Sequence, residues 1–267
     1  MVFLGKFMLP YSWACAKLRV FNMRIQKFLS QCGICSRREA EKRILEGRVS
    51  VNGSPAQIGQ DVSERDRIVV DGRKVEGIVE EKIVLAMNKP KGYLCTNEDQ
   101  FGGKTVFELL REPYAQMKLF CVGRLDKNSE GLLILTNDGE LANRIIHPSS
   151  GIVKRYHVLL NRPFDKSLIP TLLNGVMCEG EKLRASRICT PANKELPNYE
   201  CRLDVWLNQG RKREIRRMFE ALGFFVKELI RFQIGSYELR RIAPGAYKLL
   251  QQKDVDKLLS NPNNGNL

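Results

Sequence analysis

GRLDKNSEGLLILTNDGE, residues 123–140, is the most informative stretch of this chain. Its centre, residues 132–135, is a run of aliphatic side chains without a polar position, which is typical of a strand buried on both faces. An aspartate stands at each end of the stretch, Asp126 before the run and Asp138 after it. We therefore predict a central strand of a sheet, bracketed by two carboxylates whose roles have to be told apart.

The two aspartates differ in their local context. Asn137-Asp138-Gly139 precedes residues 140–146, which have helical spacing, so we expect Asn137 or Asp138 to cap the N-terminus of a helix and interpret Asp138 as a cap. Asp126 has no comparable local role, and it lies between Arg124 and Lys127, two cations that favour its ionised form. A surface aspartate in a turn is one interpretation of Asp126. An ionised carboxylate beside cations also suits a nucleophile or an electrostatic partner, and does not suit a general acid.

The overall charge points to a polyanionic partner. The 267 residues include 44 Lys and Arg against 30 Asp and Glu, a formal net charge of +14. An excess of this size favours nucleic acid or an anionic membrane face. No stretch approaches the roughly 20 apolar residues that a membrane span requires. We therefore expect a nucleic acid partner and no membrane association.

The cysteines indicate a reducing compartment. The eight cysteines are scattered through a chain that is long enough to bury a sizeable core, so we expect reduced thiols in a cytoplasmic protein. Cys32 and Cys35 have the spacing of half a zinc site, but no second such pair follows. The two histidines, His147 and His157, are far away in the sequence. We predict no metal site.

Residues 23–75 predict a small basic domain. Apolar residues at helical spacing up to Gly33 indicate one helix, and Ser36 with Glu39 fits a capping box that starts another. Asn52-Gly53 then marks a tight hairpin between short strands. The second helix carries cations that we expect to face outward and to contact phosphate groups: Arg37, Arg38, Lys42 and Arg43.

The remaining boundaries follow from changes in composition. We expect residues 1–22 to be a disordered extension or the product of an upstream start codon, and residues 76–82 to be a linker. A larger domain then covers residues 83–252. Residues 253–267 end in the polar sequence SNPNNGNL and are expected to form a C-terminal tail.

Three further segments of the larger domain carry polar groups of interest. NKPKGY, residues 88–93, predicts a loop that presents Lys89 and Lys91. KRYHVLL, residues 154–160, predicts a strand with Tyr156 on its apolar face. Residues 200–210, ECRLDVWLNQG, predict a strand with one face buried.

RKREIRRMFEALG, residues 211–223, predicts a helix with one apolar stripe and a C-terminal glycine. Arg213 and Arg217 fall on the opposite side, toward solvent or RNA. Arg216 falls at the edge of the stripe, where an arginine needs a partner because an unpaired buried charge is costly. Arg216 is therefore the cation best placed to meet a buried carboxylate.

Two resemblances bring these segments together. GICSRREAE followed by GRVSVNG resembles the S-four-type RNA-binding domain. Residues 123–140, together with NKPKGY, KRYHV, GRKREIRRMFEALG and ELIRFQIG, resemble the RsuA/RluB/RluE/RluF family of ribosomal RNA pseudouridine synthases. The resemblance covers nearly all of residues 24–250. It implies an α+β fold, in which a large, mixed, mainly antiparallel sheet is flanked by helices and follows a small N-terminal α/β RNA-binding domain.

The resemblance also implies roles for individual residues. Asp126 matches the essential catalytic aspartate, Tyr156 the tyrosine that packs on the target base and is implicated in proton abstraction, and Arg216 the arginine that pairs with the aspartate. Leu229 matches a residue that lines the pocket, and we expect Arg124 beside it. Further RNA contacts are expected from Lys89, Lys91, Arg211, Arg213 and Arg217.

Two departures from the family pattern stand close to these residues. Glu130 occupies a position at which the family usually has a small residue, and so adds a charge near Asp126. Lys212-Arg213-Glu214 replaces the common Asn-Arg-Gln. Neither departure removes a residue with an implied catalytic role.

The implied reaction is the isomerisation of a uridine in ribosomal RNA to pseudouridine, after the uridine has swung out of its stack. Asp126 would attack C1′, remove the 2′ proton or add to C6, and the sequence leaves these routes open. The reaction uses no cofactor, and we expect a monomer. Residues 139–149, GELANRIIHPS, favour the large subunit over the small one.

Two other functions compete with this interpretation. A metal-dependent nuclease would use Asp126, Asp138 and Glu140, although a strand separates the first from the other two. A catalytically inert RNA-binding factor for ribosome assembly is the second alternative. The presence of Asp126, Tyr156 and Arg216 argues for activity.

Overall fold

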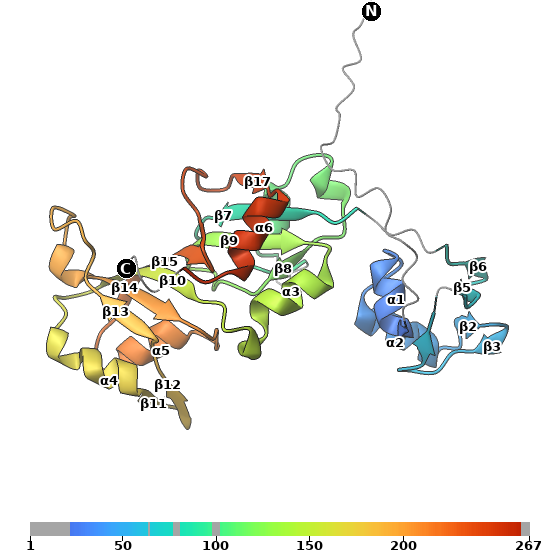
Figure 1. The fold of residues 1–267 in the computed structure, drawn as a ribbon, viewed down its shortest axis with the longest axis horizontal. Coiled ribbons are helices and arrows are strands. Elements are labelled where there is room, and N and C mark those ends of the chain that lie inside the picture. Colours follow the sequence, from blue (N-terminus) through green and yellow to red (C-terminus); the bar gives the residue numbers. More distant parts are fainter. Residues whose placement is uncertain (1–21, 64, 77–80, 98–101, 263–267) are drawn as a thin grey trace, which may run out of the picture. The chain divides into compact units, whose positions relative to one another are not determined.

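The computed structural model describes residues 22–63, 65–76, 81–97 and 102–262 (Figure 1). The expected N-terminal extension lies, up to residue 21, outside the described residues, as do residues 77–80 of the expected linker. The chain divides into two compact units between Glu81 and Lys82. Each unit has its own apolar core.

The N-terminal unit packs two helices, α1 and α2, beside a small sheet with the strand order β3-β2-β5-β6. β1 pairs with β4 separately. The bounds are β1 Met23–Arg24, α1 Ile25–Gln31, α2 Arg37–Leu45, β2 Val49–Val51, β3 Ser54–Pro55, β4 Asp61–Val62, β5 Ile68–Val70 and β6 Arg73–Lys74.

The local signals in this unit are largely confirmed. The Ser36 side chain accepts a hydrogen bond from the Glu39 N–H at the start of α2. Asn52 and Gly53 adopt positive φ angles of 52° and 86° between β2 and β3, as a tight hairpin turn requires. The capping box differs from the prediction in one half, because the Glu39 carboxylate pairs with Arg43.

The C-terminal unit is built on one nine-stranded sheet with the order β13-β14-β10-β15-β9-β7-β17, to which β8 and β16 add by pairing with β9 and β15. β15 and β9 are parallel, and the other neighbours are antiparallel. The expected mixed, mainly antiparallel sheet is thus confirmed. The bounds are β7 Val84–Lys89, β8 Phe120–Val122, β9 Glu130–Thr136, β10 Lys154–Leu160, β13 Arg187–Cys189, β14 Arg202–Leu207, β15 Val226–Ile234, β16 Tyr237–Glu238 and β17 Tyr247–Leu249.

The central strand predicted at residues 132–135 is β9, and Leu132 to Leu135 are completely buried in it. Its first pairing with β15 depends on Gly131. The φ angle there is 102°, and a Cβ would collide with the backbone carbonyl of Arg231. Only a glycine allows this close approach of the two strands. The approach places the beginning of β9 next to the middle of β15.

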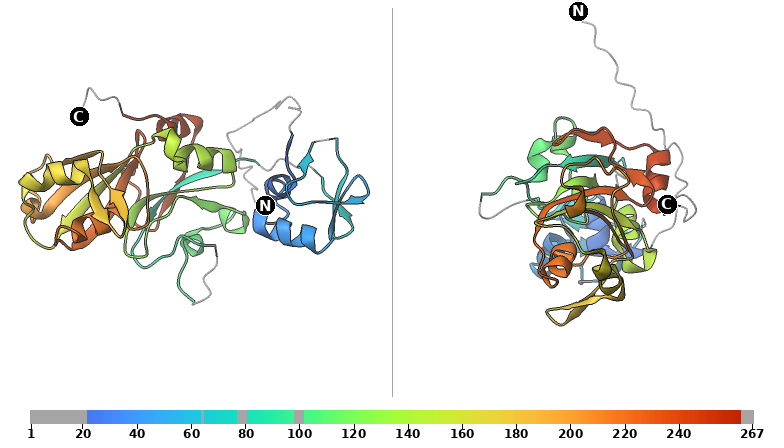
Figure 2. Two further views of the ribbon diagram at one scale, coloured as in Figure 1. Left: turned by 90° about the horizontal axis from the view of Figure 1, so that it is seen from below. Right: turned by 90° about the vertical axis from the view of Figure 1, so that its left-hand side faces the viewer.

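Helices cover the sheet in two groups. α3 and α6 pack over β7, β8 and β9, while α4, α5 and the hairpin of β11 and β12 pack over β10, β14 and β15. Figure 2 shows the yellow and orange helices of the second group gathered at the end of the sheet that carries β13 and β14. The bounds are α3 Gly139–Ile146, α4 Ile169–Asn174, β11 Val176–Cys178, β12 Glu181–Leu183, α5 Glu214–Glu220 and α6 Gln252–Leu259.

Two predictions about this unit were wrong. The expected tail from residue 253 begins with α6, whose Leu258 is completely buried among the residues packed on α3. β14 is buried on both faces and not on one, because Arg155 covers its polar face. The Arg155 guanidinium stacks 4.3 Å from the Trp206 ring centroid and pairs with Asp204.

Asp138 caps α3 as predicted, and accepts hydrogen bonds from the Glu140 and Leu141 N–H groups. In the described ranges, no helix is long and apolar enough to cross a membrane. Cysteines within those ranges form no disulfide bonds.

Candidate active site

Asp126 lies in the loop that joins β8 to β9. Its backbone carbonyl accepts the Ser129 N–H at 3.0 Å, which closes a turn just before β9 begins. The Asp126 side chain is 33% exposed. The neighbouring Leu125 is buried in the apolar cluster of β10, β14 and α5. The loop is therefore anchored by Leu125 and leaves the carboxylate within reach of a substrate.

Arg216, on α5, meets this carboxylate. Its Nε lies 3.9 Å from Asp126 Oδ2, and only 9% of its side chain is exposed. Nη1 donates to the Val226 carbonyl at 2.7 Å, and Nη2 donates to the Asn128 carbonyl at 3.1 Å. Burial, together with repulsion from Arg213, lowers the pKa of Arg216 from its ordinary value, while Asp126 raises it. The partner predicted for Arg216 at the edge of the apolar stripe is therefore Asp126.

The apolar cluster that holds Leu125 also contains two residues expected in the pocket. Tyr156 of β10 and Leu229 of β15 are both buried in the same cluster as Leu125 and Ile215. Because β10 pairs with β15, the two strands carry these side chains into one cluster. The loop thus carries a carboxylate paired with a cation, and its Leu125 shares an apolar cluster with an aromatic ring and a leucine. Such a combination suits a planar base held against apolar side chains with its sugar near the carboxylate.

Lys89 differs from the predicted RNA contact. It is completely buried, and its Nζ donates to the carbonyls of Pro90, Lys127 and Ser129 at 3.1, 3.3 and 2.7 Å. Burial lowers the pKa of this ammonium group. Two of the three carbonyls belong to the loop that carries Asp126. Lys89 therefore ties this loop to the end of β7 and is not available to a phosphate.

Arg217 also differs from its prediction. Its guanidinium pairs with Glu179 at 3.2 Å and Glu181 at 2.8 Å, and donates to the Cys178 carbonyl at 2.9 Å. These contacts hold the β11–β12 hairpin against α5. The helical wheel placed Arg217 away from the apolar stripe correctly, but the hairpin covers that side of the helix.

Other predicted cations remain at the surface. Arg124, Arg211 and Arg213 are exposed. Lys91 lies 3.3 Å from the Glu130 carboxylate, so the unusual charge of Glu130 has a cation beside it at the beginning of β9.

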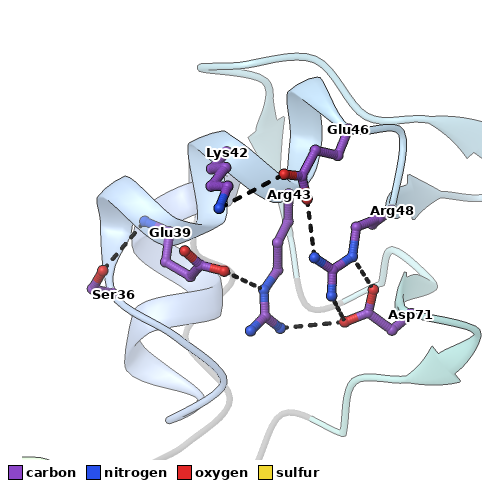
Figure 3. Close-up of polar contacts among 7 residues, drawn as sticks. All are labelled: Ser36, Glu39, Lys42, Arg43, Glu46, Arg48 and Asp71. Atoms are coloured by element: carbon purple, nitrogen blue, oxygen red, sulfur yellow. Dashed lines mark hydrogen bonds and ion pairs between the residues drawn. The ribbon is translucent and has the colours of Figure 1, made fainter.

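The cations of α2 fall into two groups. Arg37 and Arg38 are exposed and make no ion pair within the described ranges. Arg43 pairs with Glu39 and Asp71, and the nearby Arg48 pairs with Asp71 as well (Figure 3). Lys42 keeps a 67% exposed side chain at 3.9 Å from Glu46. Arg43 therefore joins α2 to the turn after β5, and does not face outward as expected.

Several buried polar residues near the site were not predicted. Ser129 is 1% exposed, and its hydroxyl lies 3.4 Å from Arg216 Nη2. Arg231 is paired with Tyr156 in register and donates to the Leu132 carbonyl. Lys154 shares the buried face of β10 with Tyr156, and burial with the nearby Arg231 lowers its pKa to about 8. No local signal in the sequence showed that Lys154 is covered.

The residues of the nuclease alternative do not converge. Asp126 and Asp138 lie at opposite ends of β9, and Asp138 is engaged as the cap of α3. In the described part of the chain, no three His, Cys, Asp or Glu side chains are grouped so that they could hold a metal ion. The geometry does not support a carboxylate-bound metal at Asp126.

Comparisons with known proteins identify the family. Residues 83–221, more than half of the chain, match the RNA pseudouridylate synthase family, and residues 23–68 match the S4 domain. The chain belongs to the RNA pseudouridylate synthase family and carries an N-terminal S4 domain.

Individual relatives support this assignment. The chain is 39% identical over 241 residues to the ribosomal large subunit pseudouridine synthase B of Pseudomonas aeruginosa, with 88% of this chain and 61% of that protein covered. It is also 39% identical over 245 residues to an RNA pseudouridine synthase of Aquifex aeolicus, with 90% and 94% covered. A crystal structure of a pseudouridylate synthase is similar at 30% identity and a TM-score of 0.62, covering 88% of this chain and 99% of the other.

Proposed function

We propose that the protein is an rRNA pseudouridine synthase, an isomerase that converts a uridine of the large ribosomal subunit RNA to pseudouridine. The family assignment and the Pseudomonas relative, whose name specifies the large subunit, support this substrate. The chain spans 61% of the length of that relative, so its substrate is carried over as part of the proposal.

The observation that carries the proposal is the pairing of Asp126 with Arg216 on a loop whose Leu125 belongs to the same apolar cluster as the buried ring of Tyr156. A uridine that has swung out of its stack can place its base on Tyr156 and Leu229. The Asp126 carboxylate then acts on the sugar or the base, with Arg216 as the counter-charge. The glycosidic bond breaks, the uracil rotates and rejoins through C5, and the C5 proton is lost. Atoms are conserved, and no cofactor is needed.

RNA binding is assigned to the exposed cations. Phosphate contacts are assigned to Arg37 and Arg38 of the N-terminal unit and to the exposed Arg124, Arg211 and Arg213 of the C-terminal unit. Such contacts give affinity without sequence readout and weaken with salt. We place this activity in the cytoplasm, where ribosomal subunits are assembled, and assign it to a monomer.

The test uses RNA fragments labelled with tritium at C5 of uridine, because pseudouridine formation releases that label. We expect release by the wild type, no detectable release by Asp126→Ala or Asp126→Asn, and RNA affinity within a few-fold of wild type for both variants. Asp256→Ala removes an exposed carboxylate on α6 and serves as the matched control with full activity. Wild-type activity that EDTA does not reduce would contradict the nuclease alternative.

Two outcomes would change the proposal. Tight binding by a wild type that modifies no ribosomal RNA fragment would favour the inert assembly factor. Mapping of pseudouridines in cells with and without this protein decides between the subunits. A site that disappears from the small subunit RNA would overturn the large subunit assignment.

A further inference from the structure

Glu130, the first residue of β9, pairs with a lysine at the edge of the site. It occupies the position at which the family usually has a small residue. Its Oε2 lies 3.3 Å from the Nζ of Lys91, and the side chains of Glu130 and Lys91 are 28% and 48% exposed. Within the described ranges Lys91 forms no other ion pair. The proposed function assigns no role to either residue of this pair.

Both partners are fixed to the main chain beside the loop of Asp126. β9 begins at Glu130, which is paired in register with Ile230 of β15. The residue after Lys91 donates its N–H to the Lys127 carbonyl, directly after Asp126, at 2.9 Å. The ion pair therefore joins the segment that follows β7 to the loop that carries the proposed catalytic carboxylate.

The carboxylate of Glu130 acts on the same buried cation as Asp126. Burial lowers the pKa of Lys89, and the charges of both carboxylates oppose this shift. Lys89 in turn donates to the Ser129 carbonyl, directly before Glu130, at 2.7 Å. Charges interact over about 8 Å at physiological salt. We therefore expect an RNA phosphate that comes close to Asp126 to interact with the charges of the pair as well.

We propose that Glu130 is a positioning residue that holds Lys91 away from RNA phosphates and so lowers the affinity of the protein for RNA. A carboxylate competes with a phosphate for the same ammonium group. While the ion pair persists its two charges cancel, and Lys91 adds little to the attraction of RNA. The inference rests on the proposed function in one respect, which is the approach of RNA to the loop of Asp126.

The net charge of +14 explains why such a restraint is useful. A strongly basic protein binds any RNA through phosphate contacts, and these contacts carry no sequence information. One cation fewer beside the site reduces the binding of RNA that has no target uridine. Removal of the Glu130 charge should therefore add about one phosphate contact, made by Lys91.

The experiment measures the binding of a fluorescein-labelled oligouridylate to the full chain by anisotropy at several salt concentrations. Glu130→Gln removes the charge and keeps the shape of the side chain. We expect this variant to bind about fivefold more tightly than the wild type at about 0.1 M salt, with a slope of log affinity against log salt that is steeper by about 0.7. Glu130→Asp keeps the charge and should retain the wild-type slope, because the flexible Lys91 can follow the shorter side chain.

Two controls identify the cation that is released. Lys248 of β17 pairs with Asp254 of α6 at the same distance of 3.3 Å, and the Lys248 side chain is 55% exposed. Asp254→Asn therefore frees a lysine and changes the net charge by the same amount, but should leave the slope unchanged. The double variant of Glu130→Gln with Lys91→Met removes both charges of the pair and should also bind like the wild type.

Kinetics separate this role from a purely structural one. With a tritium-labelled RNA fragment, Glu130→Gln should lower KM while kcat stays within about twofold, because the added contact is equally strong in the bound state and in the transition state. An unchanged slope for Glu130→Gln, an equal change for Asp254→Asn, a steeper slope that persists in the double variant, or a large loss of kcat would overturn the proposal. Binding is measured without turnover, so a wild type that forms no pseudouridine contradicts the proposed function and leaves the binding test intact.

Discussion

Arg216 approaches Asp126 to 3.9 Å while the rest of its guanidinium is held by the main chain. The carbonyls of Val226 and Asn128 accept from its two terminal nitrogens. Its Nε, the atom nearest to Asp126, is buried and makes no hydrogen bond within the described ranges. The cation is therefore in place before substrate arrives, as electrostatic preorganisation requires.

This arrangement predicts that Arg216→Lys is not conservative. An ammonium cannot reach two main-chain carbonyls and the Asp126 carboxylate with the geometry of a guanidinium. We expect the rate of pseudouridine formation at saturating RNA to fall on the order of a hundredfold, with RNA affinity nearly unchanged. Initial rates with labelled RNA measure the effect. The exposed Arg213 gives the control, because Arg213→Lys should retain most of the rate; equal losses in both variants would contradict this role of Arg216.

Substitutions of Lys89 and of Lys91 should affect stability differently, because Lys89 is buried and Lys91 is exposed. Lys89→Met leaves the buried carbonyls that Lys89 binds, including those of Lys127 and Ser129, without their donor. We expect the free energy of unfolding of the C-terminal unit to fall by about 3 kcal/mol. Lys91→Met, at an exposed position, should change it by less than about 0.5 kcal/mol. Calorimetry of the full chain resolves the transition of this unit. A stability loss of the same size for Lys91→Met would show that burial is not the cause.

The lowered pKa of Lys154 predicts that the stability of the folded protein depends on pH. Its pKa is about 8 in the folded protein, against an ordinary value of 10.5. Below pH 8 the buried ammonium is charged in both states, and the folded state bears the full penalty of about 3 kcal/mol. Between pH 8 and pH 10.5 the folded protein releases the proton first, so this penalty decreases as the pH rises.

Lys154→Met removes the titrating group. We expect its stability advantage over the wild type to be greatest at pH 7 and to shrink by pH 10, as measured by chemical unfolding at both values. Lys253→Met changes an exposed lysine at the beginning of α6 and should show a difference that does not vary with pH. An advantage of Lys154→Met that stays constant across this range would contradict the lowered pKa.

Substitutions of the exposed and of the ion-paired cations of α2 should have different effects on RNA binding and on stability. Replacing Arg37 and Arg38 together by Ala should weaken binding to ribosomal RNA and reduce the slope of log affinity against log salt by about two. Arg43→Ala should leave that slope nearly unchanged, and instead lower the stability of the N-terminal unit by about 1 kcal/mol through its lost pairs with Glu39 and Asp71. Fluorescence anisotropy at several salt concentrations measures the slope. A smaller slope for Arg43→Ala would assign it a phosphate contact after all.

Local features could be predicted because they depend on residues a few positions apart. Asp138 caps α3, Asn52-Gly53 forms the hairpin turn, and the aliphatic run at residues 132–135 becomes the buried strand β9. Helical periodicity also placed Arg216 at the edge of the buried stripe, where it meets Asp126. In each case the pattern and the structure are related by the geometry of a single element or turn.

Whether Lys89 and Arg217 are exposed depends on segments that are remote in the chain. Lys89 is buried because the loop at residues 127–129 closes over it, and Arg217 is engaged because the β11–β12 hairpin folds against α5. Charge and spacing show that a side chain can bind an anion, but only the packing of distant segments determines whether it is still exposed to do so.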